Sequence, residues 1–136
     1  MKLTYEKPKA EDYVSLRIRS GMGNKDLERS RNAIANSLFT VSIYDEEKLI
    51  GFGRIVGDQG ITYVVSDIMV DKSYQRKGYG DQIMKEINSY FEENTFEDCY
   101  ICLIANSPAD KLYHKYRFEY LPESKCGMLR KQSTKK

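Results

Sequence analysis

A basic turn that contains two glycines, Gln75–Gly80, is the part of the sequence whose residue types most directly indicate chemistry. Arg76 and Lys77 bring positive charge, and Gly78 and Gly80 lack the Cβ that would keep a ligand away from the main chain. A helix that begins at such a turn leaves about four backbone N–H groups without partners, and its dipole favours negative charge there. The turn therefore predicts a site that holds a phosphate-bearing ligand mainly through backbone amides.

Two predicted elements position this turn. Residues 63–70, YVVSDIMV, are β-branched and apolar, which is typical of a largely buried strand. Residues 81–91, DQIMKEINSYF, place four apolar or aromatic residues on one side of a helix, namely Ile83, Ile87, Tyr90 and Phe91. Since strand, turn and helix follow one another directly, we expect the anion site where the strand ends and the helix begins.

Two common phosphate-binding motifs do not fit the turn. A P-loop requires GxxxxGK[ST], and neither glycine is followed by Lys and then Ser or Thr. A dinucleotide fingerprint requires GxGxxG, whereas Ile83 stands where the third glycine belongs. At every defined position the turn instead resembles the acetyl-CoA signature Q/R-x-x-G-x-G/A of the GCN5-related N-acetyltransferases (GNAT). The matching residues are Gln75, Arg76, Lys77, Gly78, Tyr79 and Gly80.

The resemblance covers nearly the whole chain and implies its fold. We expect a single α/β (α+β) domain over residues 1–136, with helices on both faces of a mixed, mostly antiparallel sheet and a basic tail from about residue 131. The element order βααβββαβαββ matches a GNAT domain. The predicted strands are 2–7, 39–44, 49–56, 61–70, 100–105, 118–121 and 127–130. The predicted helices are 10–20, 25–35, 81–91 and one capped by Ser107.

The resemblance also implies acetyl-CoA as cosubstrate and no metal. In this family the central strand separates from its neighbour, and its exposed backbone groups pair with the pantetheine arm. Here those groups belong to Ile68, Met69 and Val70. The pyrophosphate then falls on the amides of Gln75–Gly80, and Asn106 matches a polar residue that contacts the cofactor arm.

A tyrosine near the C-terminus is the implied general acid. Residues 109–118, ADKLYHKYRF, are similar to the family pattern A-x-x-L-Y-x-x-x-G-F and put Tyr113 at the tyrosine position. A tyrosine, with a pKa of about 10, can give its proton to a departing thiolate. Arg117 stands where the family has glycine. The alternative for Tyr113 is a packed aromatic residue on an apolar stripe.

The base that would take the amine proton is less well defined. Family members frequently place a glutamate on the central strand, whereas this strand offers Ser66 and Asp67. Asp67 lies on the face opposite its two neighbours. Two roles remain open: Asp67 contacts the ammonium or takes its proton through water, or it is a structural carboxylate that caps backbone groups where the strands separate.

In this family the two N-terminal helices line the acceptor side of the cleft. The residues that this implies as substrate neighbours are Tyr13, Arg17, Arg19, Met22 and Arg31. For each of them an ordinary surface or packing role is the alternative. The three arginines lean toward an acceptor that carries a carboxylate.

The predicted function is acetyl-CoA-dependent N-acetyl transfer to a primary amine by direct attack in a ternary complex. The chain has no recognisable Cys-His or Ser-His motif, and the reaction requires no covalent nucleophile. A small acceptor such as an amino acid is favoured over a protein or peptide amine, because the chain shows no appended recognition module. The alternative is a sensor that binds acyl-CoA without transferring the acyl group.

Composition limits the remaining classes. A net charge of +2 over 136 residues argues against a dedicated nucleic-acid binder. No apolar run approaches the roughly 20 residues that span a bilayer, and the N-terminus has no signal-like core, so we expect a cytoplasmic monomer or homodimer. Cys99 and Cys102 lack the second pair that a zinc site needs. Buried, reduced thiols are therefore expected at Cys99, Cys102 and Cys126.

Overall fold

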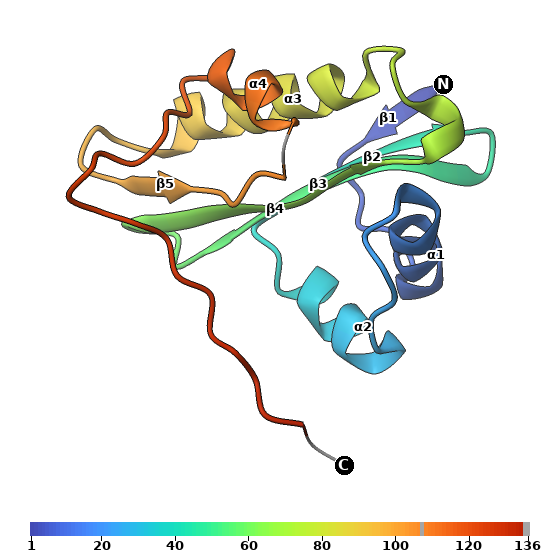
Figure 1. Cartoon of the computed structure of the whole chain (residues 1–136). Coiled ribbons are helices and arrows are strands. Elements are labelled where there is room, and N and C mark those ends of the chain that lie inside the picture. Colours follow the sequence, from blue (N-terminus) through green and yellow to red (C-terminus); the bar gives the residue numbers. More distant parts are fainter. Residues whose placement is uncertain (107, 135–136) are drawn as a thin grey trace.

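Five strands form one sheet in the computed structural model, which describes residues 1–106 and 108–134 (Figure 1). The strands are β1 (Lys2–Thr4), β2 (Phe39–Asp45), β3 (Lys48–Gly57), β4 (Thr62–Val70) and β5 (Tyr100–Cys102). They lie side by side in the order β1-β2-β3-β4-β5. Pairing is antiparallel from β1 to β4, whereas β5 runs parallel to β4, which confirms the predicted mixed and mostly antiparallel sheet.

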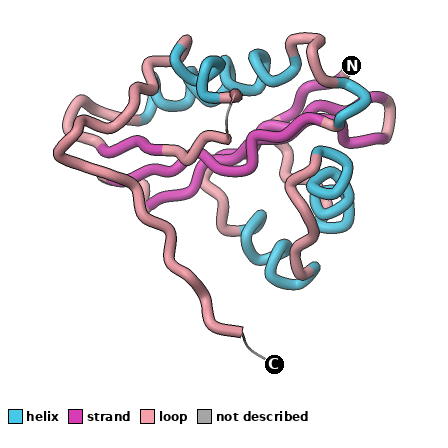
Figure 2. Tube along the Cα trace, viewed as in Figure 1, coloured by secondary structure: helices cyan, strands magenta, loops and turns pink. Residues whose placement is uncertain are grey.

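Helices cover both faces of this sheet. The first face carries α1 (Ala10–Ser20) and α2 (Leu27–Ala35), and the other carries α3 (Tyr79–Asn94) and the short α4 (Asp110–His114) (Figures 1 and 2). A 3-10 turn, Lys72–Tyr74, joins β4 to α3. Each layer has its own apolar cluster. Leu16, Phe52 and Met69 belong to the α1 side, and Ile43, Ile83 and Ile87 belong to the α3 side.

Local capping sets the helix ends. Gly21, with φ of 90°, ends α1 in the left-handed conformation that glycine adopts without strain. The carboxylate of Asp26 accepts a hydrogen bond from the Arg29 amide (2.9 Å), so α2 begins two residues later than predicted. Gly78, with φ of 89°, begins α3.

Gly53 lets α3 pack directly on the middle of β3. A Cβ at this position would lie 2.6 Å from Ile68 Cδ1 and 2.7 Å from Ile83 Cγ2. Gly51 faces the same helix with more room, because its Cβ would lie 3.2 Å from Ile83 Cδ1. Both glycines therefore serve the close contact between sheet and helix.

Gly53→Ala is expected to lower the free energy of unfolding by about 1–3 kcal/mol, because an extra methyl group in a filled core forces its neighbours apart. Urea denaturation followed by circular dichroism measures this change. Gly51→Ala is the matched control and should cost less. Equal losses in the two variants would contradict the packing argument.

Strand β4 carries one extra residue opposite Gly53. The register pairs on either side are Phe52 with Met69 and Arg54 with Ser66. Gly53 therefore faces two residues of β4, Asp67 and Ile68. Asp67 has φ of 59°, the left-handed conformation found at the first residue of one class of β-bulge. The bulge bends β4 at its centre.

The other edge of β4 is open from a point just before the bulge. Within the described residues its pairing with β5 ends at Val64 and Cys102. The second half of β4 therefore has a partner on the β3 side only. This separation of β4 from β5 is the one that the family resemblance implied.

The predicted strands 118–121 and 127–130 are wrong, because residues 118–134 contain no strand. Met128 and Leu129 are 89% and 87% exposed, and the tail leads away from the sheet (Figure 2). An apolar, β-prone stretch becomes a strand only where a neighbouring edge satisfies its N–H and C=O groups. The predicted strand 100–105 is also shortened, to Tyr100–Cys102.

All three cysteines are free thiols. The expectation that they are buried is wrong for Cys102 and Cys126, which are exposed, and Cys99 is half-buried. The reason is that β5 is a short edge strand and Cys126 lies in the C-terminal loop. None of the described helices combines the length and apolar character needed to cross a bilayer.

Candidate active site

The turn at the start of α3 presents a row of free backbone amides. The first hydrogen bond of the helix runs from the Gln82 amide to the Gly78 carbonyl (3.1 Å). The amides of residues 76–81 have no acceptor within residues 1–106 and 108–134, and no side chain caps this end. Arg76 and Gly78 both adopt positive φ, 65° and 89°, and turn the chain sharply. Clustered amides of this kind attract anions, as the sequence predicts.

The open edge of β4 leads directly into this turn. The Asp71 amide donates to the Ile50 carbonyl (2.8 Å), so Asp71 faces β3. Because backbone direction alternates along a strand, Ile68 and Val70 direct their N–H and C=O groups toward the open edge. Met69 directs its groups toward β3. Of the three predicted backbone contacts, the geometry therefore favours those at Ile68 and Val70.

Gln75 ties the turn to this edge. Its Nε2 donates a hydrogen bond to the Val70 carbonyl (2.9 Å). The side chains of Arg76 and Lys77 are exposed beside it, and Lys77 Nζ lies 5.7 Å from the centre of the Tyr74 ring. The turn thus holds a fixed position relative to β4 and keeps its positive charges in solvent.

Helix α4 docks against the first turn of α3. The Tyr116 hydroxyl donates to Asp81 Oδ1 (2.7 Å), and Lys115 Nζ lies 2.9 Å from the same oxygen. Burial and the bond to Asp81 raise the pKa of Tyr116 to about 12, and the partners Lys115 and Tyr116 lower the pKa of Asp81. A Cβ on Gly80 would lie 3.5 Å from Leu112. These contacts place α4 next to the amide-rich turn.

This docking buries Tyr113, which is 8% exposed and packs edge-on against Phe118. Burial raises the pKa of its phenol, so the hydroxyl keeps its proton at neutral pH. The buried ring matches the packed aromatic alternative, and the protonated hydroxyl is compatible with the predicted general acid, which stays a prediction.

Arg117 follows α4 with φ of 70°, which explains why the family uses glycine at this position. Its guanidinium pairs with Glu92 at 2.9 Å, and both side chains are exposed. We expect Arg117→Gly to raise the free energy of unfolding by about 0.5–1 kcal/mol, because relief of a left-handed side chain outweighs an exposed ion pair. Thermal or urea unfolding measures the gain.

Arg117→Ala is the control for this change, since it removes the same ion pair but keeps a Cβ at positive φ. It should be no more stable than the wild type. If Arg117→Gly is no more stable than Arg117→Ala, the backbone strain at this turn is negligible.

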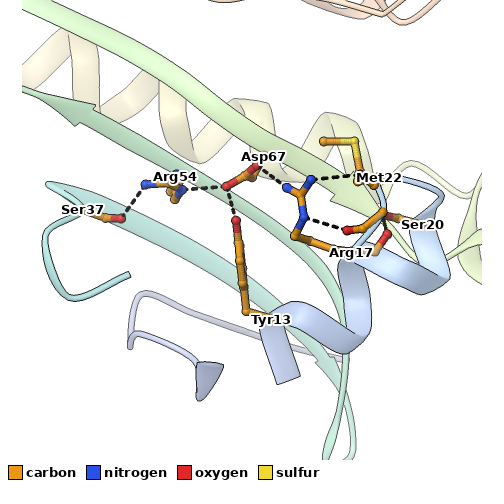
Figure 3. A network of polar contacts seen from close by, with 8 residues as sticks. Tyr13, Arg17, Ser20, Met22, Ser37, Arg54 and Asp67 are labelled. Carbon is orange, nitrogen blue, oxygen red and sulfur yellow. Dashed lines mark hydrogen bonds and ion pairs between the residues drawn. The ribbon is translucent and has the colours of Figure 1, made fainter. Parts of the chain in front are cut away.

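Asp67 lies at the centre of a polar network beneath β4 (Figure 3). Its carboxylate accepts hydrogen bonds from the Tyr13 hydroxyl (2.6 Å), Arg17 Nη1 (2.9 Å) and Arg54 Nε (2.7 Å). Burial and the bond to Asp67 raise the pKa of Tyr13, which keeps it a donor. With only 9% of its side chain exposed and both oxygens engaged, Asp67 is a buried, paired carboxylate. Its three donors are side chains, and not the backbone groups that the structural alternative named.

The arginines predicted near the acceptor all have intramolecular partners. Arg17 also donates to the carbonyls of Met22 and Gly23, each at 2.9 Å. Arg19 pairs with the buried Asp71, where the Ser73 amide and Arg19 lower the pKa of Asp71 although burial opposes this. Arg31 pairs with Glu11 and Glu28 on the surface. The preference for a carboxylate-bearing acceptor stays a prediction.

Asn106 is exposed after β5, and its carbonyl accepts a hydrogen bond from the Ala109 amide (2.7 Å). The predicted cap at Ser107 lies outside the described residues. Among the residues that are described, no group of three or more His, Cys, Asp or Glu side chains is arranged to hold a metal ion.

Comparison with known proteins identifies the fold and the family. The family model described as an acetyltransferase (GNAT) domain matches residues 36–120, more than half of the chain. This protein belongs to the GNAT acetyltransferases. The match includes β4, the signature turn, α3 and Tyr113, so the elements brought together above are those of a GNAT domain.

Solved structures agree over the whole domain. A probable acetyltransferase from meticillin-resistant Staphylococcus aureus is 44% identical, with a TM-score of 0.91 over 96% of this chain and 98% of that one. A GNAT-family acetyltransferase from Streptococcus pneumoniae is 27% identical, with a TM-score of 0.78 over 96% and 97%. A histone acetyltransferase from Glycine max is 24% identical over 86% of this chain and 54% of its own length. The chain thus spans about half the length of this relative.

Two features of this GNAT domain were not predicted. Arg54 of β3 binds Asp67, and the Gln75 side chain binds the β4 edge. The sequence did contain a signal for the ion pair of Arg54, because a charged residue in an otherwise apolar strand needs a partner of opposite charge when it is buried. No sequence signal specified which carboxylate that partner would be.

Proposed function

We propose that this domain is an acetyl-CoA-dependent N-acetyltransferase that acts on a primary amine in a ternary complex. The observation that supports it most directly is the continuity of two backbone sites. The open edge of β4 at Ile68 and Val70 runs into the free amides of residues 76–81. The β4 edge suits an extended pantetheine arm, and the amides of the turn suit a diphosphate.

Acetyl-CoA supplies the activated acetyl group in this proposal. The Ile68 amide faces the open edge and donates to the thioester oxygen, where negative charge develops. The turn holds the diphosphate, and orienting two reactants in this way can contribute about 7–11 kcal/mol to lowering the barrier. The nitrogen of the neutral amine attacks the thioester carbon, so that a C–N bond forms and the C–S bond breaks. Tyr113, a buried phenol with a raised pKa, gives its proton to the leaving thiolate. The proton lost by the attacking nitrogen goes to solvent water, and the phenol regains its own proton from solvent.

The acceptor that we propose is a small amine that reacts in its neutral form. The network beneath β4 contains the guanidiniums of Arg17 and Arg54 and one carboxylate, which leaves one excess positive charge close to the bulge. Such a charge disfavours a polycation and favours the uncharged amine that attacks the thioester. A protein amine is the second class to test, because a relative is named as a histone acetyltransferase.

Release of free thiol from acetyl-CoA tests this function. The purified domain is incubated with saturating acetyl-CoA and a panel of amino acids, arylalkylamines, aminoglycosides, polyamines and a lysine peptide. Amine-dependent thiol release, with the acetylated amine found by mass spectrometry, supports transfer. A rise in melting temperature with acetyl-CoA but no thiol release with any amine supports the sensor instead. A melting temperature that CoA does not change would refute both.

A further inference from the structure

The carboxylate of Asp67 joins elements that lie far apart in the sequence. Tyr13 and Arg17 come from α1, Arg54 comes from β3, and Asp67 lies in the bulge of β4 (Figure 3). The side chains of Asp67 and Arg17 are 9% and 8% exposed, and that of Arg54 is 15% exposed. Water is therefore largely excluded, so these charge-assisted hydrogen bonds are strong and their geometry is fixed.

The network acts on the backbone of the bulge. A non-glycine residue at φ of 59° is unfavourable, although aspartate tolerates this conformation better than most residues. Three donors on three sides of the carboxylate hold the side chain, and the side chain holds the left-handed backbone. Because the bulge reverses the alternation of β4, it decides that the amide of the next residue, Ile68, faces the open edge.

The same network reaches the loops at both ends of α2. Arg17 Nε and Nη2 donate to the carbonyls of Gly23 and Met22, both at 2.9 Å, in the loop between α1 and α2. Arg54 Nη1 lies 3.3 Å from the hydroxyl of Ser37, which follows α2. One carboxylate thereby connects β4 to the loops before and after α2, the side on which the family resemblance implies the acceptor.

We propose that Asp67 is a positioning residue, whose buried carboxylate holds the β4 bulge and the α1–α2 loop in register so that the Ile68 amide meets the thioester and the acceptor reaches it. Asp67 takes no proton in this role. The inference rests on the proposed acetyl transfer, and it assigns to Tyr13, Arg17 and Arg54 the task of holding Asp67.

Asp67→Asn is the principal test, since asparagine keeps the size and tolerates positive φ but removes the charge. We expect kcat to fall about 10- to 100-fold, because small misplacements of reacting groups have effects of this size. CoA affinity should fall much less than kcat, because the diphosphate stays on the amides of the turn. The shape of the pH–rate profile should also be unchanged. Loss of a limb of that profile would instead make Asp67 the base.

Asp58→Asn is the matched control. Asp58 caps the turn at the other end of the same strand, where it accepts hydrogen bonds from the amides of Gly60, Ile61 and Thr62. The variant should lose stability without a change in kcat. If it lowers kcat as much as Asp67→Asn at the same loss of stability, the role of Asp67 is structural only. Tyr13→Phe removes one hydrogen bond and keeps every charge, so it remains a test if Asp67→Asn does not fold.

An activity-independent measurement separates failure of this inference from failure of the proposed function. In amide NMR spectra of the wild type, acetyl-CoA should shift the signals of Ile68, Gly78 and Gly80. In Asp67→Asn the shifts of Gly78 and Gly80 should persist while that of Ile68 is lost. An unchanged Ile68 response in the variant overturns the positioning role. If none of the three signals responds in the wild type, the proposed function itself is wrong.

Discussion

Gly78→Val is expected to weaken CoA binding by about 10- to 100-fold. The residue has φ of 89°, where a β-branched side chain costs of the order of 1–3 kcal/mol, and about 1.4 kcal/mol corresponds to a tenfold loss of affinity. Apart from the adjacent residues, no described atom lies within 4 Å of the Cβ position, so the side chain itself fits and the expected loss comes from the backbone that the turn must adopt to bind. Isothermal titration with CoA measures the change.

Gly23→Val is the matched control for this variant. Gly23 has φ of 86° and equally open surroundings, but it lies in the loop between α1 and α2. Both variants carry the same backbone penalty, and only Gly78→Val should lose CoA affinity. Equal affinity in Gly78→Val and the wild type would remove the assignment of the turn to the diphosphate.

Tyr113→Phe is expected to lower kcat by about 100-fold or more while CoA affinity stays nearly intact, since positioned general acids typically contribute at least this factor. The ring fills the same apolar space in both forms, and only the hydroxyl is lost. Steady-state thiol release with the best acceptor from the panel measures kcat, and titration with CoA measures affinity.

The pH dependence provides a second readout for Tyr113. Burial raises the pKa of this phenol above about 10, so its proton is retained as pH rises through the neutral and mildly alkaline range. The wild-type kcat should therefore show no loss from this group below about pH 10.

Tyr120→Phe is the matched control for Tyr113→Phe, because Tyr120 is 70% exposed and pairs with Asp110. Equal kcat in Tyr113→Phe and Tyr120→Phe would leave Tyr113 a packing residue.

Features that depend only on residues close together in the sequence were predictable from it. The turn Gln75–Gly80, where we propose that a diphosphate binds, lies between a strand and a helix that follow one another in the sequence, so it contains the information for its own geometry. The bounds of α1 were predicted correctly for the same reason, because an apolar stripe and a following glycine are local signals. The family signature then extended this local site to a complete fold.

The partners of charged residues were decided by the tertiary structure. Asp67 meets Tyr13 and Arg17 across 54 and 50 positions, and only the sheet order and the bulge bring them together. The same long-range packing engages the arginines predicted for the acceptor, and it makes Gly53 a contact point for α3. It also leaves residues 118–130 without a neighbouring edge. The sequence by itself thus determined the turn and the family, since local backbone chemistry carries both. Only the tertiary structure decided which side chains bind Asp67 of β4, because a buried charge pairs with the groups that the topology places next to it.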